Sequence, residues 1–194
     1  MKEIIMSLDR IINTLPMPKE FFEVASSTET RNRVNVDIIR YQPNNKISPN
    51  NEHITIVMDS GENLISYNNY SFKEGGNLPD DQSAIETAVN ILNQILPDYS
   101  KYLSYMRTDY QYRSYTNVEG KQVEIPVMWI KFAHNNGTYN WVTLGPNSAI
   151  IEIEIESEWD YMHGRRSTEM WNNDDWVLAR RGEGPQLQAP SALA

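Results

Sequence analysis

The chain has 194 residues, no cysteine, and 26 acidic against 17 basic residues, which gives a formal net charge of −9. Without cysteine it has no disulfide framework, no thiol nucleophile and no cysteine-based zinc or iron–sulfur site. The acidic balance disfavours nucleic acid as a partner, because binding to phosphate backbones depends on lysine and arginine. It disfavours anionic membrane surfaces for the same reason.

No targeting or membrane segment is apparent. The chain contains no run of 18 or more apolar residues, and its first ten residues carry charges where a signal peptide needs an apolar stretch. We therefore expect no membrane insertion. If the sequence is the full-length product, we expect a cytoplasmic location.

The first expected element is a helix within an N-terminal helical segment, residues 1–25. Pro16 and Pro18 end this helix, and residues 26–28 are predicted as a loop. Its apolar residues recur at helical spacing and form one stripe, made of Ile4, Ile5, Leu8, Ile11, Ile12 and Leu15. We expect the stripe to pack on the rest of the chain, and a dimer seam is the alternative.

An α+β domain is predicted over residues 26–181. Strands with two-residue alternation come first, at residues 32–42, 53–58 and 63–67. A helix over residues 79–97 follows, with Asp80, Asp81 or Ser83 as its N-cap and Pro97 as its stop.

The remainder of the domain is rich in predicted strands. They lie at residues 103–116, 123–132, 139–144 and 150–158. A short helix is expected near residues 168–176, and residues 182–194 are expected to form a loose C-terminal tail. Strands on both sides of one helix favour a twisted antiparallel sheet, arranged as two hairpin units, with the helix packed across one face.

One stretch resembles a known family. The likeness to the strand–turn–strand of PepSY-type domains is carried by the run Met58-Asp59-Ser60-Gly61-Glu62-Asn63-Leu64-Ile65-Ser66-Tyr67. Residues 78–96 are similar to the helix that follows this hairpin, and residues 129–154 resemble a second copy of the hairpin. The likeness covers about residues 54–156, with Ser60 where the family commonly has threonine.

PepSY-type domains are small α+β modules without catalytic residues. The resemblance therefore implies a binding or regulatory module and not an enzyme, and it implies no particular site residues.

Four glutamates share one face of the last predicted strand, because side chains on a strand alternate between its two faces. They are Glu152, Glu154, Glu156 and Glu158. A cation site is one interpretation, since calcium prefers oxygen ligands. Successive side chains on one face lie about 7 Å apart, however, which is too far to surround one ion. We favour a solvated face paired with basic residues on a neighbouring strand, for which Arg107, Arg113, Lys121 and Lys131 are available.

Catalytic signatures are weak. The three histidines show no metal-ligand spacing, and the sequence has no phosphate-binding loop and no G-x-S-x-G motif. His163 is the one candidate base, with Asp160 or Glu169 as its partner. We predict no catalytic residue, no metal and no cofactor, and hence no enzymatic activity.

The most distinctive stretch is residues 159–181, with three tryptophans and four arginines. Both residue types are frequent in the energetic centres of protein interfaces. The candidate binding residues are Trp159, His163, Arg165, Arg166, Trp171 and Trp176. We predict that this stretch contacts a protein partner. A small-molecule pocket near His163 and closure of the core by these aromatics are the alternatives.

Overall fold

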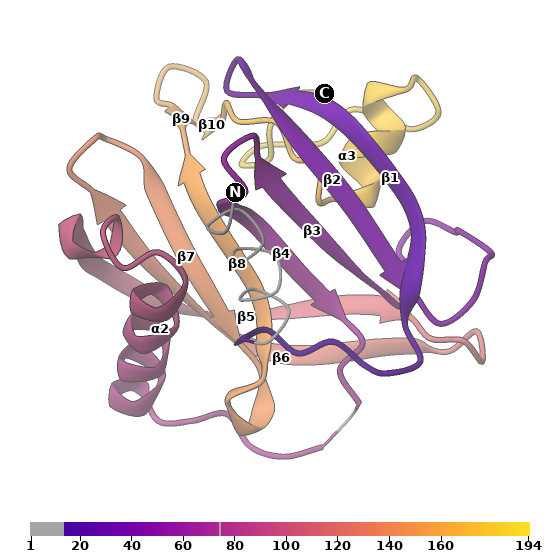
Figure 1. The fold of residues 1–194 in the computed structure, drawn as a ribbon, viewed down its shortest axis with the longest axis horizontal. Helices are drawn as coiled ribbons and strands as arrows, with labels where there is room; N and C mark the ends of the chain where they lie inside the picture. The colour runs from indigo at the N-terminus through magenta and orange to yellow at the C-terminus, as the bar shows by residue number, and fades with distance from the viewer. Residues whose placement is uncertain (1–13, 74) are drawn as a thin grey trace, which may run out of the picture.

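The computed structural model describes residues 14–73 and 75–194 (Figure 1). Within these residues, one sheet of eight antiparallel strands forms the centre, in the order β1-β2-β3-β4-β8-β7-β6-β5. The strands are β1 (Phe22–Arg31), β2 (Val34–Gln42), β3 (His53–Asp59), β4 (Leu64–Tyr70), β5 (Leu103–Thr116), β6 (Gln122–His134), β7 (Tyr139–Leu144) and β8 (Ile150–Ser157). β1–β4 and β5–β8 are two meanders that join through the β4–β8 pair.

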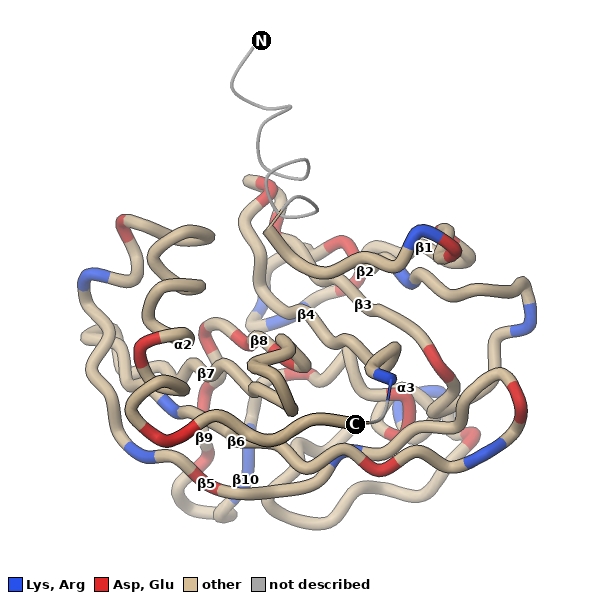
Figure 2. Tube along the Cα trace, turned by 90° about the horizontal axis from the view of Figure 1, so that it is seen from below, with Lys and Arg blue, Asp and Glu red and all other residues tan. Residues whose placement is uncertain are grey.

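Short elements complete the described chain. They are α2 (Asp81–Ile95), α3 (Asp174–Arg180), the 3₁₀ turns η1 (Ser100–Tyr102) and η2 (Pro146–Ser148), and a small hairpin of β9 (Trp159–Asp160) and β10 (Arg165–Arg166). Figure 1 shows β5 and β6 running across the diagonal of β2–β4, so the sheet is strongly twisted. Both trace views place α2 and α3 at opposite ends of the sheet (Figures 1 and 2).

The antiparallel sheet is present, but the predicted α+β class is wrong. The fold is mostly β, with 44% of the described residues in strands and 16% in helices. α2 has 15 residues and is therefore about 22 Å long. Eight strands spaced about 4.8 Å apart extend over about 34 Å. The helix is thus too short to lie across the sheet, and it packs mainly against β6 and β7.

The position of α2 itself agrees with the helix predicted at residues 79–97. Asp80 is the N-cap, and its carboxylate accepts a hydrogen bond of 3.0 Å from the backbone N–H of Ser83. The residues that α2 buries in the main core are Ala84, Ala88, Ile91 and Leu92. Helical periodicity therefore predicts the position of this helix correctly, but the prediction that the helix lies across the sheet is wrong.

The loop predicted at residues 26–28 is wrong, because these residues lie within β1. β1 pairs with β2 through a two-residue turn at Asn32 and Arg33, where φ is +48° and +68°. Two successive positive φ angles are typical of the type I′ hairpin turn, which sequences usually mark with Asn-Gly. Arginine at the second position conceals that signal.

The short helix predicted at residues 168–176 begins later, at Asp174. The side chain of Asn173 caps α3 by accepting a hydrogen bond of 2.9 Å from the N–H of Trp176. Most of the predicted N-terminal helix lies outside the described residues. Residues 182–194 form no helix or strand, but the N–H of Arg166 donates to the carbonyl of Pro190 at 2.9 Å, and Ala192 is buried.

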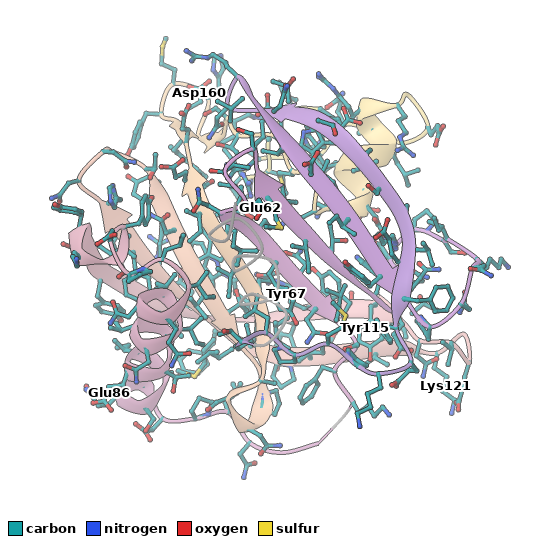
Figure 3. The ribbon with its side chains drawn as sticks, viewed as in Figure 1. Glu62, Tyr67, Glu86, Tyr115, Lys121 and Asp160 are labelled. Carbon is teal, nitrogen blue, oxygen red and sulfur yellow. The ribbon has the colours of Figure 1, made fainter. Side chains whose placement is uncertain are left out.

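Both faces of the sheet are covered over its central strands. On one face, Leu15, Phe21 and α2 close the main core. The hydroxyl of Tyr67, a residue labelled in Figure 3, donates to the carbonyl of Pro16 at 2.6 Å. On the other face, Trp171 of the C-terminal segment packs on a smaller cluster, made of Val36, Val57, Ile65 and Ile38. No helix in the described part of the chain has the length and apolar character needed to span a membrane.

Candidate ligand pocket

A pocket of about 760 Å³ lies on the sheet face opposite α2. β5, β6, β7 and β8 form its floor, and the C-terminal segment from Ser157 to Ser191 forms one wall. The strand period of two explains which side chains face it. On β6, Met128 and Ile130 point into the main core, so Trp129 and Lys131 point into the pocket.

Strand register brings the functional side chains side by side. Lys131 lies opposite Arg107 of β5 and Trp141 of β7. The neighbouring row places Trp129 opposite Asp109 and Thr143. Directly paired side chains on one face are about 5 Å apart at Cβ, so these rows form continuous contacts across the floor.

Six aromatic side chains line the pocket. They are Tyr70, Trp129, Tyr139, Trp141, Trp159 and Tyr161. The rings of Trp129 and Trp141 lie 5.4 Å apart and are tilted by 53°. Tyr139 on β7 and Tyr161 on the β9–β10 hairpin are joined by a hydrogen bond between their hydroxyl groups. This bond ties the hairpin to the sheet at the edge of the pocket.

Lys131 lies among these rings. Its Nζ is 3.8 Å from the ring centre of Tyr139, 5.5 Å from that of Trp129 and 5.9 Å from that of Trp159. Partial burial and the charge of Arg107 lower the pKa of Lys131, and the charge of Asp109 partly offsets this. The ammonium group is therefore held by ring faces and not by a carboxylate contact.

Glu152 is buried at the inner end of the pocket and is fully paired. Arg113 contacts both of its carboxylate oxygens, at 2.6 and 2.9 Å, and Thr143 donates to it at 2.8 Å. Burial alone would raise the pKa of Glu152, but the charge and hydrogen bonds of Arg113 outweigh burial and lower this pKa. Glu152 is thus held ionised.

Glu154 anchors the C-terminal segment to the sheet. Its carboxylate pairs with Arg31 of β1 at 2.9 Å and with Arg166 of β10, and Asn172 donates to it at 3.3 Å. The predicted solvated face is wrong for Glu152 and Glu154, because both side chains are buried. Arg166 and Asn172 of the C-terminal segment contact Glu154. Arg113, one of the basic residues considered, does pair with Glu152, but it lies on β5, which is not a neighbour of β8 as the prediction assumed.

The predicted binding residues separate into groups. Trp159 and Arg166 line the pocket. Arg165, directly beside Arg166 on β10, is half-buried. His163 is exposed at the hairpin tip and its Nδ1 lies 2.6 Å from Asp160 Oδ2.

The predicted base, His163, is held in a turn. Asp160 also accepts hydrogen bonds from the N–H groups of Met162 and His163, so it organises the hairpin tip. The other suggested partner, Glu169, accepts from the N–H of Asn32 instead. His163 therefore contacts Asp160 as predicted, but neither residue lines the pocket.

Trp171 and Trp176 lie apart from this pocket. Trp176 is fully buried, and its ring meets that of Trp171 edge to face at 4.9 Å. Trp171 donates to the carbonyl of Thr30 at 2.9 Å and lines a second pocket of about 390 Å³ between β1, β2 and α3.

Sequence reasoning missed the sheet half of the pocket. Trp129, Tyr139 and Trp141 lie in predicted strands but in no predicted site, and Arg107 and Lys131 are predicted only as partners for the acidic strand. The available signal was the alternation of large aromatic or cationic residues with aliphatic ones on β6 and β7. On such strands both faces carry large side chains, so both require a partner.

Within residues 14–73 and 75–194, no group of three or more histidine, aspartate or glutamate side chains is placed to hold a metal ion. Comparison of the chain with protein-family models, curated proteins and solved structures returned no match. The PepSY-type resemblance therefore stays a prediction.

Proposed function

We propose that this protein is a non-catalytic binding protein whose pocket between β5–β8 and the C-terminal segment holds a small molecule. The observation that carries the proposal is a pocket of about 760 Å³ lined by six aromatic rings. Ligand pockets typically have volumes of roughly 300–1,000 Å³ and aromatic walls with a few placed polar groups.

The polar groups of the pocket support binding more than catalysis. A general acid or base must be free to exchange a proton with a substrate. Glu152 is engaged by Arg113, and Asp109 by Arg107 at 2.7 Å. The His163–Asp160 pair is not part of the lining. The lining thus offers ring faces and cations, which recognise a ligand without reacting with it.

The five tryptophans provide an internal control for a test of this proposal. Trp129, Trp141 and Trp159 line the pocket, whereas Trp171 and Trp176 do not. We would screen one-ring and two-ring compounds by recording the indole N–H resonances of uniformly ¹⁵N-labelled protein.

A pocket ligand should shift the indole signals of Trp129, Trp141 and Trp159 in a saturable way and leave Trp176 unmoved. A response at Trp171 alone would assign binding to the smaller pocket and contradict the proposal. A screen in which no compound moves any of the three pocket indoles would also overturn it.

A protein partner at residues 159–181, as predicted from the sequence, is the second candidate function. One observation favours it: the tip of the β9–β10 hairpin exposes Tyr161 and Met162, at 74% and 92%. Trp171 is unsuitable for a test because it packs on buried Trp176. Met162→Asp changes the tip alone, and loss of a specific partner in a pull-down with that variant would support this candidate.

A further inference from the structure

The charges around the pocket are not balanced. Four cations line it, and these are Arg107, Arg113, Lys131 and Arg166. Only two acids line it, Asp109 and Glu152. Elsewhere in this acidic chain, acidic and basic positions are interspersed along the trace (Figure 2). The pocket is therefore a locally cationic site in a protein of formal charge −9.

Three of the four cations have a carboxylate partner. Arg113 pairs with Glu152, Arg166 with Glu154, and the Nε of Arg107 with Asp109. Lys131 makes no ion pair and no hydrogen bond within the described part of the chain. The terminal nitrogens of Arg107 likewise have no acceptor there. Lys131 and Arg107 lie opposite each other in strand register, so two cationic groups with free donors share one spot on the pocket floor.

Aromatic rings surround that spot. Trp129 is near both cations, with Arg107 Cζ at 5.6 Å and Lys131 Nζ at 5.5 Å from its ring centre. A cationic ligand would meet two like charges there. A neutral ligand would further remove water from Lys131 without supplying a counter-charge, which is costly. An anion removes both difficulties, because it accepts the free donors and balances the charge.

We propose that the pocket binds a planar ring that carries one anionic group. The ring stacks on the Trp129 and Trp159 side of the wall, and the anionic group lies on Lys131 and Arg107. Carboxylate and phosphate share the required chemistry, since both present several acceptor oxygens to N–H donors. This inference rests on the proposed function and names the class of ligand that the pocket takes.

The test uses three probes with the same ring and different charge. They are 2-naphthoate, 2-naphthamide and 2-naphthylmethylammonium, titrated into the full chain by calorimetry at low salt. We expect 2-naphthoate to bind at least tenfold more tightly than 2-naphthamide, and the ammonium probe to be the weakest. 2-Naphthyl phosphate is the fourth arm, and its affinity relative to 2-naphthoate distinguishes phosphate from carboxylate as the preferred group.

Lys131→Met removes the charge but keeps an unbranched apolar side chain among the rings, and it should reduce the preference for the anion to less than threefold. The matched control is Lys121→Met, on the exposed β5–β6 turn at the end of the molecule away from Asp160 (Figure 3). It should leave the preference unchanged. If Lys131→Met does not fold, salt dependence of the wild type replaces it: added salt should weaken 2-naphthoate and spare 2-naphthamide.

The outcomes separate the two proposals. Equal binding of 2-naphthamide and 2-naphthoate, with shifts of the pocket indoles, would overturn the anion preference and leave the proposed function standing. Tighter binding of the ammonium probe would do the same. Failure of all four probes to move the pocket indoles would count against both.

Discussion

Arg31 and Glu154 are 123 residues apart in sequence, and their side chains meet at 2.9 Å with only 4% and 1% of their surface exposed. Arg166 contacts the same carboxylate. These three residues join the edge strand β1, the central strand β8 and the C-terminal hairpin. The wall of the pocket is therefore fixed to its floor by a buried charge cluster.

Loss of the central carboxylate should be strongly destabilising. Glu154→Gln preserves the size of the side chain but leaves two buried guanidinium groups without a counter-charge, so we expect a loss of about 3–5 kcal/mol in the free energy of unfolding. Arg31→Met should cost less, because Glu154 retains Arg166. Urea denaturation measures both. The control is Asp98→Asn in the exposed pair with Lys101, which should be silent. Equal losses for Glu154→Gln and Arg31→Met would contradict the central role of the carboxylate.

Acid should destabilise the fold through His53. Burial, and then the charge of Arg40, lower the pKa of His53 from 6.5 to about 4. On acidification the unfolded chain therefore takes up this proton at a higher pH than the folded chain does. The stabilisation from the neutral, buried ring of His53 is complete above about pH 6.5 and is lost as the pH falls toward 4. The difference between the two pKa values corresponds to about 3 kcal/mol in the free energy of unfolding.

The measurement for His53 is the free energy of unfolding between pH 4 and pH 7.5, for the wild type and for His53→Gln. The wild type should lose more stability on acidification than the variant, which lacks the titrating ring. Parallel curves would show that burial does not disfavour the charged form of His53.

Local signals in the sequence located most of the elements. The strand predicted at residues 139–144 coincides with β7, and the one at residues 53–58 with β3. Alternation and turn residues are properties of neighbouring positions, which is why they succeed. β1 was missed because its turn uses Arg33 in place of glycine.

The site could not be predicted in the same way. Lys131 and Arg107 are brought together by the register of β5 against β6, and Lys131 and Trp141 by the register of β6 against β7. Hydrophobic patterning shows which residues share a face, but the pocket exists only because residues 157–191 cover part of that face. The burial of Glu154 has the same long-range origin.

Docking of α2 on the sheet can be tested with two substitutions on one helix. Leu92→Ala removes a side chain that is 2% exposed in the main core, and we expect a loss of about 2–5 kcal/mol. Val89→Ala, one turn earlier and 38% exposed, should change stability little, because alanine is the better helix former. Similar losses from both substitutions, measured by urea denaturation, would disagree with the observed orientation of α2.

The β1–β2 turn offers a stabilising substitution. Arg33 has φ of +68°, a conformation that costs a side chain roughly 1–2 kcal/mol and glycine nothing. Glycine also increases the conformational entropy of the unfolded chain, which offsets part of this gain. The net stabilisation from Arg33→Gly should therefore be about 0.5–1 kcal/mol.

Asn32 should be retained, because its Nδ2 donates to the carbonyl of Glu156 at 2.9 Å. Glu29→Gly, in extended backbone of β1, is the matched control and should destabilise. A higher midpoint of thermal unfolding for Arg33→Gly alone would confirm the turn, whereas losses in both variants would show that residue 33 does not adopt a left-handed conformation in solution.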